Sequence, residues 1–165
     1  MIKDNLLNKG ELIKLKSSII SNNFPWYFQD YIAYADSNEK GFYFTHIFYD
    51  KDRQLRPVNT PNSNYYFIIE PILDILKPKS LIRVKGNLYM STSKLVYHPF
   101  HIDYSYDHKA AIFYINTNDG LTILGDGVKI KSIENRLLLF DGSQEHRSTS
   151  CTDKKYRMNI NFNYQ

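Results

Sequence analysis

The part of the chain after Pro78 constrains the fold most, because it consists of short segments in which apolar and polar residues alternate. Alternation with a period of two places successive side chains on opposite faces of a strand, and the Gly and Asn residues between the segments indicate turns. The pattern predicts eight strands, at 81–90, 97–105, 109–117, 120–125, 128–132, 136–141, 144–150 and 155–164. Eight consecutive strands with short connections predict a jelly roll of two antiparallel sheets.

The residues before Pro78 have a different pattern and predict supporting elements. Apolar residues at helical spacing predict a helix over 11–20 and a second over 64–76, in which Pro71 is expected to cause a kink. An aromatic strand is expected over 42–49. The polar segment 50–63 contains two prolines and is expected to be a loop that acts as a substrate lid.

The length of the chain fits one domain. We expect a mainly β domain with flanking helices (α+β) over 1–165, in which 1–78 support a cupin-like jelly-roll core (double-stranded β-helix) over 79–165. No apolar run approaches the roughly 20 residues of a membrane-spanning helix. Residues 1–10 show no secretory signal, so the cytoplasm is the expected location.

The net charge of +4 raises nucleic acid as a partner, because clustered Lys and Arg neutralise phosphates. The basic residues are scattered, however, which argues against a binding surface. Five aromatic residues could stack on bases, although packing of a helix against the sheet explains them better. They are Trp26, Tyr27, Phe28, Tyr31 and Tyr34.

Two of the predicted strands carry a polar row opposite an apolar row. The first row consists of Arg83, Lys85, Asn87 and Tyr89, opposite Ile82, Val84 and Leu88. The second consists of Arg157, Asn159, Asn161 and Asn163, opposite Met158, Ile160 and Phe162. Each row alone is equally well explained by exposure to water, so the residues between the two strands decide its meaning.

The sequence His101-Ile102-Asp103 places two metal-ligating side chains on one face of a predicted strand. His146 follows 45 residues after His101 and supplies a third ligand. Two imidazoles and a carboxylate are the facial triad of non-haem Fe(II) oxygenases, which leaves coordination positions open for other ligands. By itself His-x-Asp is a weak signal, since most isolated histidines are hydrogen-bonded structural residues.

Arg157 strengthens the metal hypothesis, because it follows His146 by 11 residues on the last predicted strand. Its guanidinium can bind a carboxylate through two parallel hydrogen bonds. The alternative for Arg157 is a surface salt bridge. His98 and His108 do not follow the alternation expected of ligands and are interpreted as flanking or substrate-side residues.

These residues together resemble the 2-oxoglutarate (2OG) and Fe(II)-dependent oxygenase superfamily, in particular short prolyl-4-hydroxylase-like members often carried by bacteriophages. The resemblance covers most of the chain. Its ordered segments are 24–27, 81–89, 98–103, 136–142, His146 and 157–162.

The resemblance implies that His101, Asp103 and His146 bind Fe(II) and that Arg157 binds the distal carboxylate of 2OG. Tyr89 is a further expected 2OG contact. Three less certain 2OG contacts are Asn87, Asn159 and Thr122. The Asn-x-Tyr and Arg-x-Asn pairs also resemble AlkB-type oxygenases, although Asn87 lies further from His101 than that subfamily usually allows.

The implied reaction is hydroxylation of an unactivated C–H bond with dioxygen, coupled to decarboxylation of 2OG to succinate and CO2. The carboxylate ligand Asp103 favours hydroxylation over halogenation. A peptidyl proline or another protein side chain is the favoured substrate, and a small molecule stays open. The alternatives are a non-catalytic cupin-like metal-binding module and a nucleobase-directed AlkB-like oxygenase. If the chain is phage-encoded, it is expected in the host cytoplasm.

Overall fold

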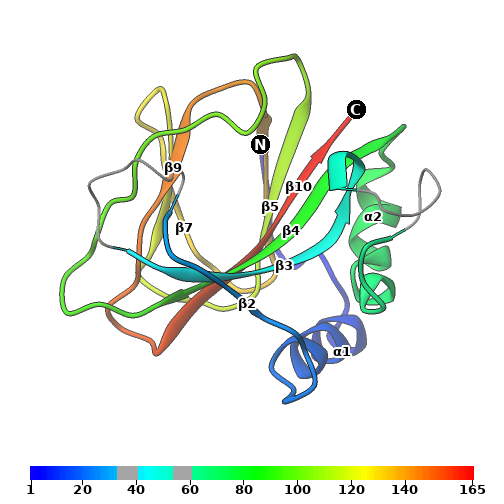
Figure 1. Ribbon diagram of the computed structural model, residues 1–165, viewed down its shortest axis with the longest axis horizontal. Helices are drawn as coiled ribbons and strands as arrows, with labels where there is room; N and C mark the ends of the chain where they lie inside the picture. Colours follow the sequence, from blue (N-terminus) through cyan, green and yellow to red (C-terminus); the bar gives the residue numbers. More distant parts are fainter. Residues whose placement is uncertain (33–40, 54–60) are drawn as a thin grey trace.

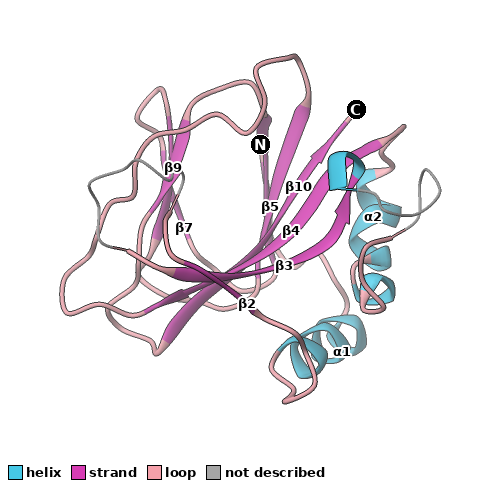
Figure 2. Cartoon of the chain, in the orientation of Figure 1, coloured by secondary structure: helices cyan, strands magenta, loops and turns pink. Residues whose placement is uncertain are grey.

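Two antiparallel sheets face each other in the computed structural model, which describes residues 1–32, 41–53 and 61–165. Two helices cover the outer face of the larger sheet, and the smaller sheet lies across from its inner face (Figure 1). Strands dominate the chain, as Figure 2 shows. The predicted mainly β jelly roll with N-terminal support helices is therefore confirmed.

The larger sheet has the spatial order β1-β8-β5-β10-β4-β3-β2. Its strands are β1 (Ile2–Lys3), β2 (Tyr27–Gln29), β3 (Tyr43–Asp50), β4 (Leu81–Met90), β5 (Lys109–Tyr114), β8 (Arg136–Asp141) and β10 (Tyr156–Tyr164). The smaller sheet has the order β7-β6-β9. Its strands are β7 (Lys129–Lys131), β6 (Leu121–Leu124) and β9 (His146–Ser148).

Two helices support the larger sheet from outside. Helix α1 (Lys9–Ile19) begins at Asn8, which forms a capping box with Glu11. Helix α2 (Glu70–Leu76) follows two short 3-10 helices, η1 (Lys51–Arg53) and η2 (Tyr66–Ile68). In the described part of the chain, no helix has the length and apolar character needed to cross a membrane.

The predicted single helix over 64–76 with a kink at Pro71 is wrong. Pro71 lies in the first turn of α2, where its missing N–H has no intrahelical acceptor in any case. The proline therefore begins a helix. The predicted lid over 50–63 includes 54–60, which lie outside the described residues.

The predicted strand over 97–105 is also wrong. Only two isolated bridges form there, between Tyr97 and Thr149 and between His101 and His146. Pro99 lies between the two bridges and has no N–H to donate to a neighbouring strand, so a continuous ladder cannot form. The segment still runs beside β9 and carries two of the candidate ligands.

Strands β4 and β10 pair in a register that places the two polar rows together on the inner face. Tyr89 lies opposite Arg157, Asn87 opposite Asn159, Lys85 opposite Asn161 and Arg83 opposite Asn163. Directly paired residues of an antiparallel sheet project from the same face. The asparagines of this face are buried, so the explanation by exposure to water does not hold.

The aromatic residues near β2 are only partly core residues. Trp26 packs against the main hydrophobic core. Tyr27 and Phe28 are 60% and 58% exposed, and Tyr31 is also exposed, so the prediction that they pack inside is wrong for these three. Strand β2 is at the edge of the sheet, where side chains have fewer neighbours. Tyr34 lies outside the described residues.

Candidate metal centre

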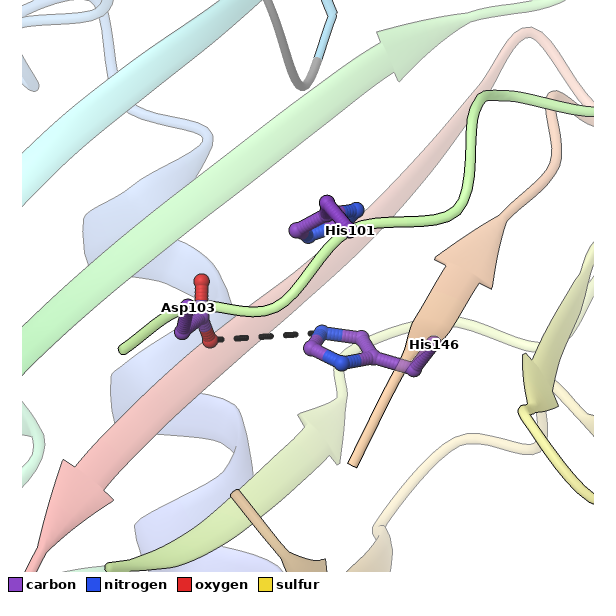
Figure 3. Close-up of side chains that lie close together, drawn as sticks. All are labelled: His101, Asp103 and His146. Carbon is purple, nitrogen blue, oxygen red and sulfur yellow. Dashed lines mark ion pairs between the residues drawn. The ribbon is translucent and has the colours of Figure 1, made fainter. Parts of the chain in front are cut away.

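His101, Asp103 and His146 come together between the two sheets (Figure 3). His146 begins β9, and the other two lie on the segment beside it. The backbones of His101 and His146 exchange two N–H···O bonds of 2.9 and 3.0 Å, which fix the two histidines side by side. One ligand atom from each of the three residues lies within 4.8 Å of the others.

Each imidazole is oriented by a backbone carbonyl two residues earlier in the chain. Nδ1 of His101 is 3.4 Å from the Pro99 carbonyl oxygen, and Nδ1 of His146 is 3.2 Å from that of Gln144. A metal-binding histidine typically donates its second ring N–H in this way. The other ring nitrogen is left for a metal, and Nε2 of His146 faces Oδ2 of Asp103 at 3.9 Å.

The protonation states suit a divalent cation. Burial, followed by the neighbouring His146, lowers the pKa of His101 to about 4, so its imidazole is neutral at pH 7. Burial alone would raise the pKa of Asp103, but Arg83 and Lys85 outweigh it and hold this pKa well below its usual range. Two imidazoles and one carboxylate match the donor set of a facial-triad Fe(II) site.

Two further side chains hold the Asp103 carboxylate in place. Arg83 donates from Nη2 to Oδ1 at 2.6 Å, and Asn161 donates from Nδ2 to Oδ2 at 2.8 Å. Both residues belong to the polar rows predicted from the sequence, but the alternation did not predict that they contact Asp103. That contact depends on the path of the 97–105 segment, which period-two alternation does not specify.

Arg157 lies four residues before Asn161 on β10, and Asn159 lies between them on the same face. The Arg157 side chain is fully buried. Its guanidinium donates to three neutral oxygens: Oγ of Ser132 at 2.9 Å, Oγ1 of Thr122 at 3.1 Å and the carbonyl oxygen of Thr149 at 3.4 Å. Among residues 1–32, 41–53 and 61–165, no carboxylate forms an ion pair with it. The expected alternative of a surface salt bridge is therefore wrong.

A glycine makes room for this arginine. A Cβ atom at Gly120 would lie 2.5 Å from Cδ of Arg157 and 2.7 Å from the carbonyl oxygen of Ser150. Both distances are far below van der Waals contact, so any larger residue would displace the guanidinium or the backbone. Nothing in the sequence pattern singled out Gly120 for this role.

The other predicted site residues lie between Arg157 and the three candidate ligands. The ring of Tyr89 is 5.5 Å from the Arg157 guanidinium carbon, and Asn87 donates to Oδ1 of Asn159 at 2.9 Å. Thr122 also accepts a hydrogen bond from the Tyr114 hydroxyl. A small cavity of about 40 Å³ is lined by all three candidate ligands and by Asn87, Tyr89, Thr122 and Asn159.

The remaining histidines have partners that occupy their rings. His108 has its two ring nitrogens on the Tyr106 carbonyl and on Oδ1 of Asn163. His46 is satisfied at both nitrogens in the same manner. His98 is bonded to Oγ of Ser148 and stacks on Tyr89 at 5.1 Å between ring centroids. It therefore borders the candidate site without being one of the three residues that converge.

Neither a protein-family model nor a curated protein matches the sequence. Solved structures do match the fold. An oxidoreductase of the 2OG-Fe(II) oxygenase family from Burkholderia pseudomallei has a TM-score of 0.72 and 10% identity, covering 100% of this chain and 84% of that one.

Two prolyl hydroxylases are also similar. One from Trichoplax adhaerens, in complex with a peptide fragment of a hypoxia inducible factor oxygen degradation domain, has a TM-score of 0.71 and 13% identity over 99% of this chain and 82% of that one. The viral collagen prolyl hydroxylase of Paramecium Bursaria Chlorella virus-1, in complex with 2OG, has a TM-score of 0.64 and 10% identity over 99% and 94%. At these identities the likeness shows a common fold.

Proposed function

We propose that the chain is a 2OG- and Fe(II)-dependent dioxygenase that hydroxylates an unactivated C–H bond. The observation that carries the proposal is the position of Arg157, a buried cation without a carboxylate partner in the described residues. It faces the space between the two sheets, where His101, Asp103 and His146 also come together. Burying a charge without a counter-charge is costly. A ligand carboxylate would supply that counter-charge.

The residues present fit both groups. His101, Asp103 and His146 would hold Fe(II), and Arg157 would bind the distal carboxylate of 2OG beside Thr122 and Tyr89. When bound, Fe(II) would supply the activation of dioxygen that drives decarboxylation of 2OG and hydroxylation. The fold that the chain shares with solved 2OG oxygenases supports this assignment.

The protein's own part is to orient the ligands and to exclude water. Arg83 and Lys85 keep the Asp103 carboxylate ionised, and the hydrogen bonds from Arg83 and Asn161 hold it in place. Asn87 and Asn159, which bond to each other, would line the path of the co-substrate between Arg157 and the metal. The 40 Å³ cavity is smaller than a 2OG molecule, so binding requires these side chains to shift.

Anaerobic binding tests the proposal directly. Adding Fe(II) and 2OG to the protein should give a visible charge-transfer band, and His101→Ala should abolish it. Arg157→Gln should weaken 2OG binding by roughly tenfold or more, as expected for loss of a charge-assisted carboxylate contact. If the folded protein binds metal but gives neither the charge-transfer band nor succinate, it is instead a non-catalytic cupin-like module.

The substrate class is a separate question. A peptidyl proline or another protein side chain is the class favoured by the resemblance, and the Trichoplax neighbour contains a peptide. A small-molecule substrate is the alternative. The side chains around the candidate metal site bear on this choice.

A further inference from the structure

A second cation faces the interior beside the metal ligands. Lys85 lies opposite Asn161 of β10 and Ile47 of β3. Asn161 donates to Asp103, so Lys85 projects from the same face at the level of the candidate metal site. The sequence placed Lys85 in the polar row but assigned it no role.

No carboxylate of the described residues is in contact with Lys85, although that of Asp103 lies near enough to interact with its charge. Within the described residues Lys85 makes neither an ion pair nor a hydrogen bond, whereas its neighbour Arg83 is neutralised by Asp103 at 2.6 Å. Its Nζ lies 5.9 Å from the ring centroid of Tyr43. Burial and the adjacent Arg83 lower the pKa of Lys85 to about 8, so the side chain is still mostly charged at pH 7.

A cavity of about 160 Å³ adjoins this lysine. Its lining includes Tyr43, Arg83, Lys85, Tyr89, His101 and Asp103. The cavity thus joins an unpaired cation and an aromatic wall to two of the candidate metal ligands. It is smaller than the roughly 300–1,000 Å³ pockets that hold drug-sized ligands, so it suits a compact molecule.

The proposed 2OG site accounts for Arg157 and leaves Lys85 unmatched. Lys85 and Tyr89, the cross-strand partner of Arg157, are four residues apart on β4, which separates their Cα atoms by about 13 Å. Lys85 lines both cavities: the 40 Å³ cavity together with Asn159 and Thr122, and the 160 Å³ cavity, which Asn159 and Thr122 do not line. One carboxylate of 2OG would bind Arg157 and the other would bind the metal, and the 160 Å³ cavity beside Lys85 has room for a further compact acid.

We infer that Lys85 binds a carboxylate of the substrate, and that the substrate is a small organic acid and not a residue within a peptide chain. This inference rests on the proposed function. Tyr43, which stacks on Tyr89 with ring centroids 5.2 Å apart, would pack against the apolar part of the acid. A carboxylate held here would bring nearby C–H bonds close to the metal ligands His101 and Asp103.

Binding of a matched pair of probes tests the inference without turnover. N-acetyl-L-proline carries a free carboxylate, whereas N-acetyl-L-prolinamide imitates a proline within a peptide. Each is titrated into the full chain loaded with Mn(II) and 2OG, and paramagnetic broadening of the ring protons reports binding near the metal. The variants are Lys85→Met, Lys85→Arg and, as a control, Lys129→Met at an exposed position of β7.

We expect the acid to bind and the amide to bind at least about tenfold more weakly. Lys85→Met should lower the affinity for the acid by a similar factor, while Lys85→Arg and Lys129→Met should retain the original affinity. The affinity for 2OG, measured by the anaerobic charge-transfer band, should stay within about threefold in Lys85→Met. Circular dichroism checks that each variant is folded.

Three results would overturn the inference: equal binding of acid and amide, unchanged binding of the acid in Lys85→Met, or an equal loss of 2OG affinity in that variant. The last result would place Lys85 in the 2OG site. Failure of the proposed function has a different signature, because 2OG affinity would then be insensitive to Arg157→Gln.

Discussion

Strands β4 and β10 present two faces that differ in what holds them together. On the outer face, Val84, Ile160 and Phe162 join the core that also contains residues of both helices. On the inner face, every cross-strand pair from Tyr89–Arg157 to Arg83–Asn163 contains polar side chains. The outer face lowers the free energy of the fold by apolar burial, whereas the inner face buries charges and amides that are only partly satisfied.

Unsatisfied atoms on the inner face make this difference concrete. Oδ1 of Asn87, Oδ1 of Asn161 and Nδ2 of Asn163 are buried and have no hydrogen-bond partner among the residues that the structure describes. Each such atom costs about 1–3 kcal/mol. Proteins retain buried polar groups of this kind mainly where function needs them. The outer face therefore serves stability, and the inner face serves binding.

The difference between the two faces should be largest in the stability of variants at two adjacent positions of β10. Ile160→Ala removes a fully buried side chain from the outer face and should lower the free energy of unfolding by about 2–5 kcal/mol. Mn(II) affinity should not change in the folded fraction. Asn159→Ala, on the inner face, should cost only about 1–3 kcal/mol, because it leaves Nδ2 of Asn87 without its acceptor.

Urea unfolding and Mn(II) titration of both variants measure these effects. The distinction between the faces would fail if Ile160→Ala impaired metal binding as much as stability. It would also fail if Asn159→Ala proved the more destabilising change.

The sequence predicted the two faces of β4 and β10 because alternation survives in long strands. It did not predict β1 and β2, which have two and three residues and no readable period. The failure at 97–105 has a chemical cause in Pro99. The residue types and spacing of His101, Asp103 and His146 were enough to predict them as ligands. The contacts of Arg83 and Asn161 with Asp103 depend on how separate segments pack together, which local sequence patterns do not specify.

Arg83→Gln sharpens the comparison on the inner face alone. The variant removes the 2.6 Å bond to Oδ1 of Asp103 and leaves Asn161 as the remaining orienting donor. Loss of such an orienting partner should weaken Mn(II) binding by about 10–100-fold. Isothermal titration calorimetry at pH 7 measures the change.

Arg136→Gln is the matched control, since Arg136 also pairs with a carboxylate, that of Asp4, through two hydrogen bonds of 2.6 and 2.9 Å. Asp4 is half exposed. This control should leave metal affinity unchanged and alter stability by no more than about 1 kcal/mol. Equal effects of the two variants on Mn(II) affinity would contradict a specific role of Arg83.

The smallest effect concerns the pH dependence of stability, to which His98 on the inner side should contribute. Burial, followed by the nearby Arg157, lowers the pKa of His98 from its ordinary value of 6.5 to about 3. Between these two values the unfolded chain binds a proton that the folded chain does not, so stability must fall as the pH drops from 6.5 toward 3. His98→Gln should flatten this dependence by at most about 1.4 kcal/mol per pH unit.

Urea unfolding of the metal-free protein at pH 6.5 and 4.5 measures the slope. Ile160→Val serves as the control, because it alters the outer face without changing a titratable group and should keep the slope of the unmodified chain. His46 and His101 also have lowered pKa values and contribute to the slope of every variant. The difference between His98→Gln and Ile160→Val therefore isolates His98. Parallel curves for these two variants would show that the buried imidazole beside Tyr89 is not a source of acid sensitivity.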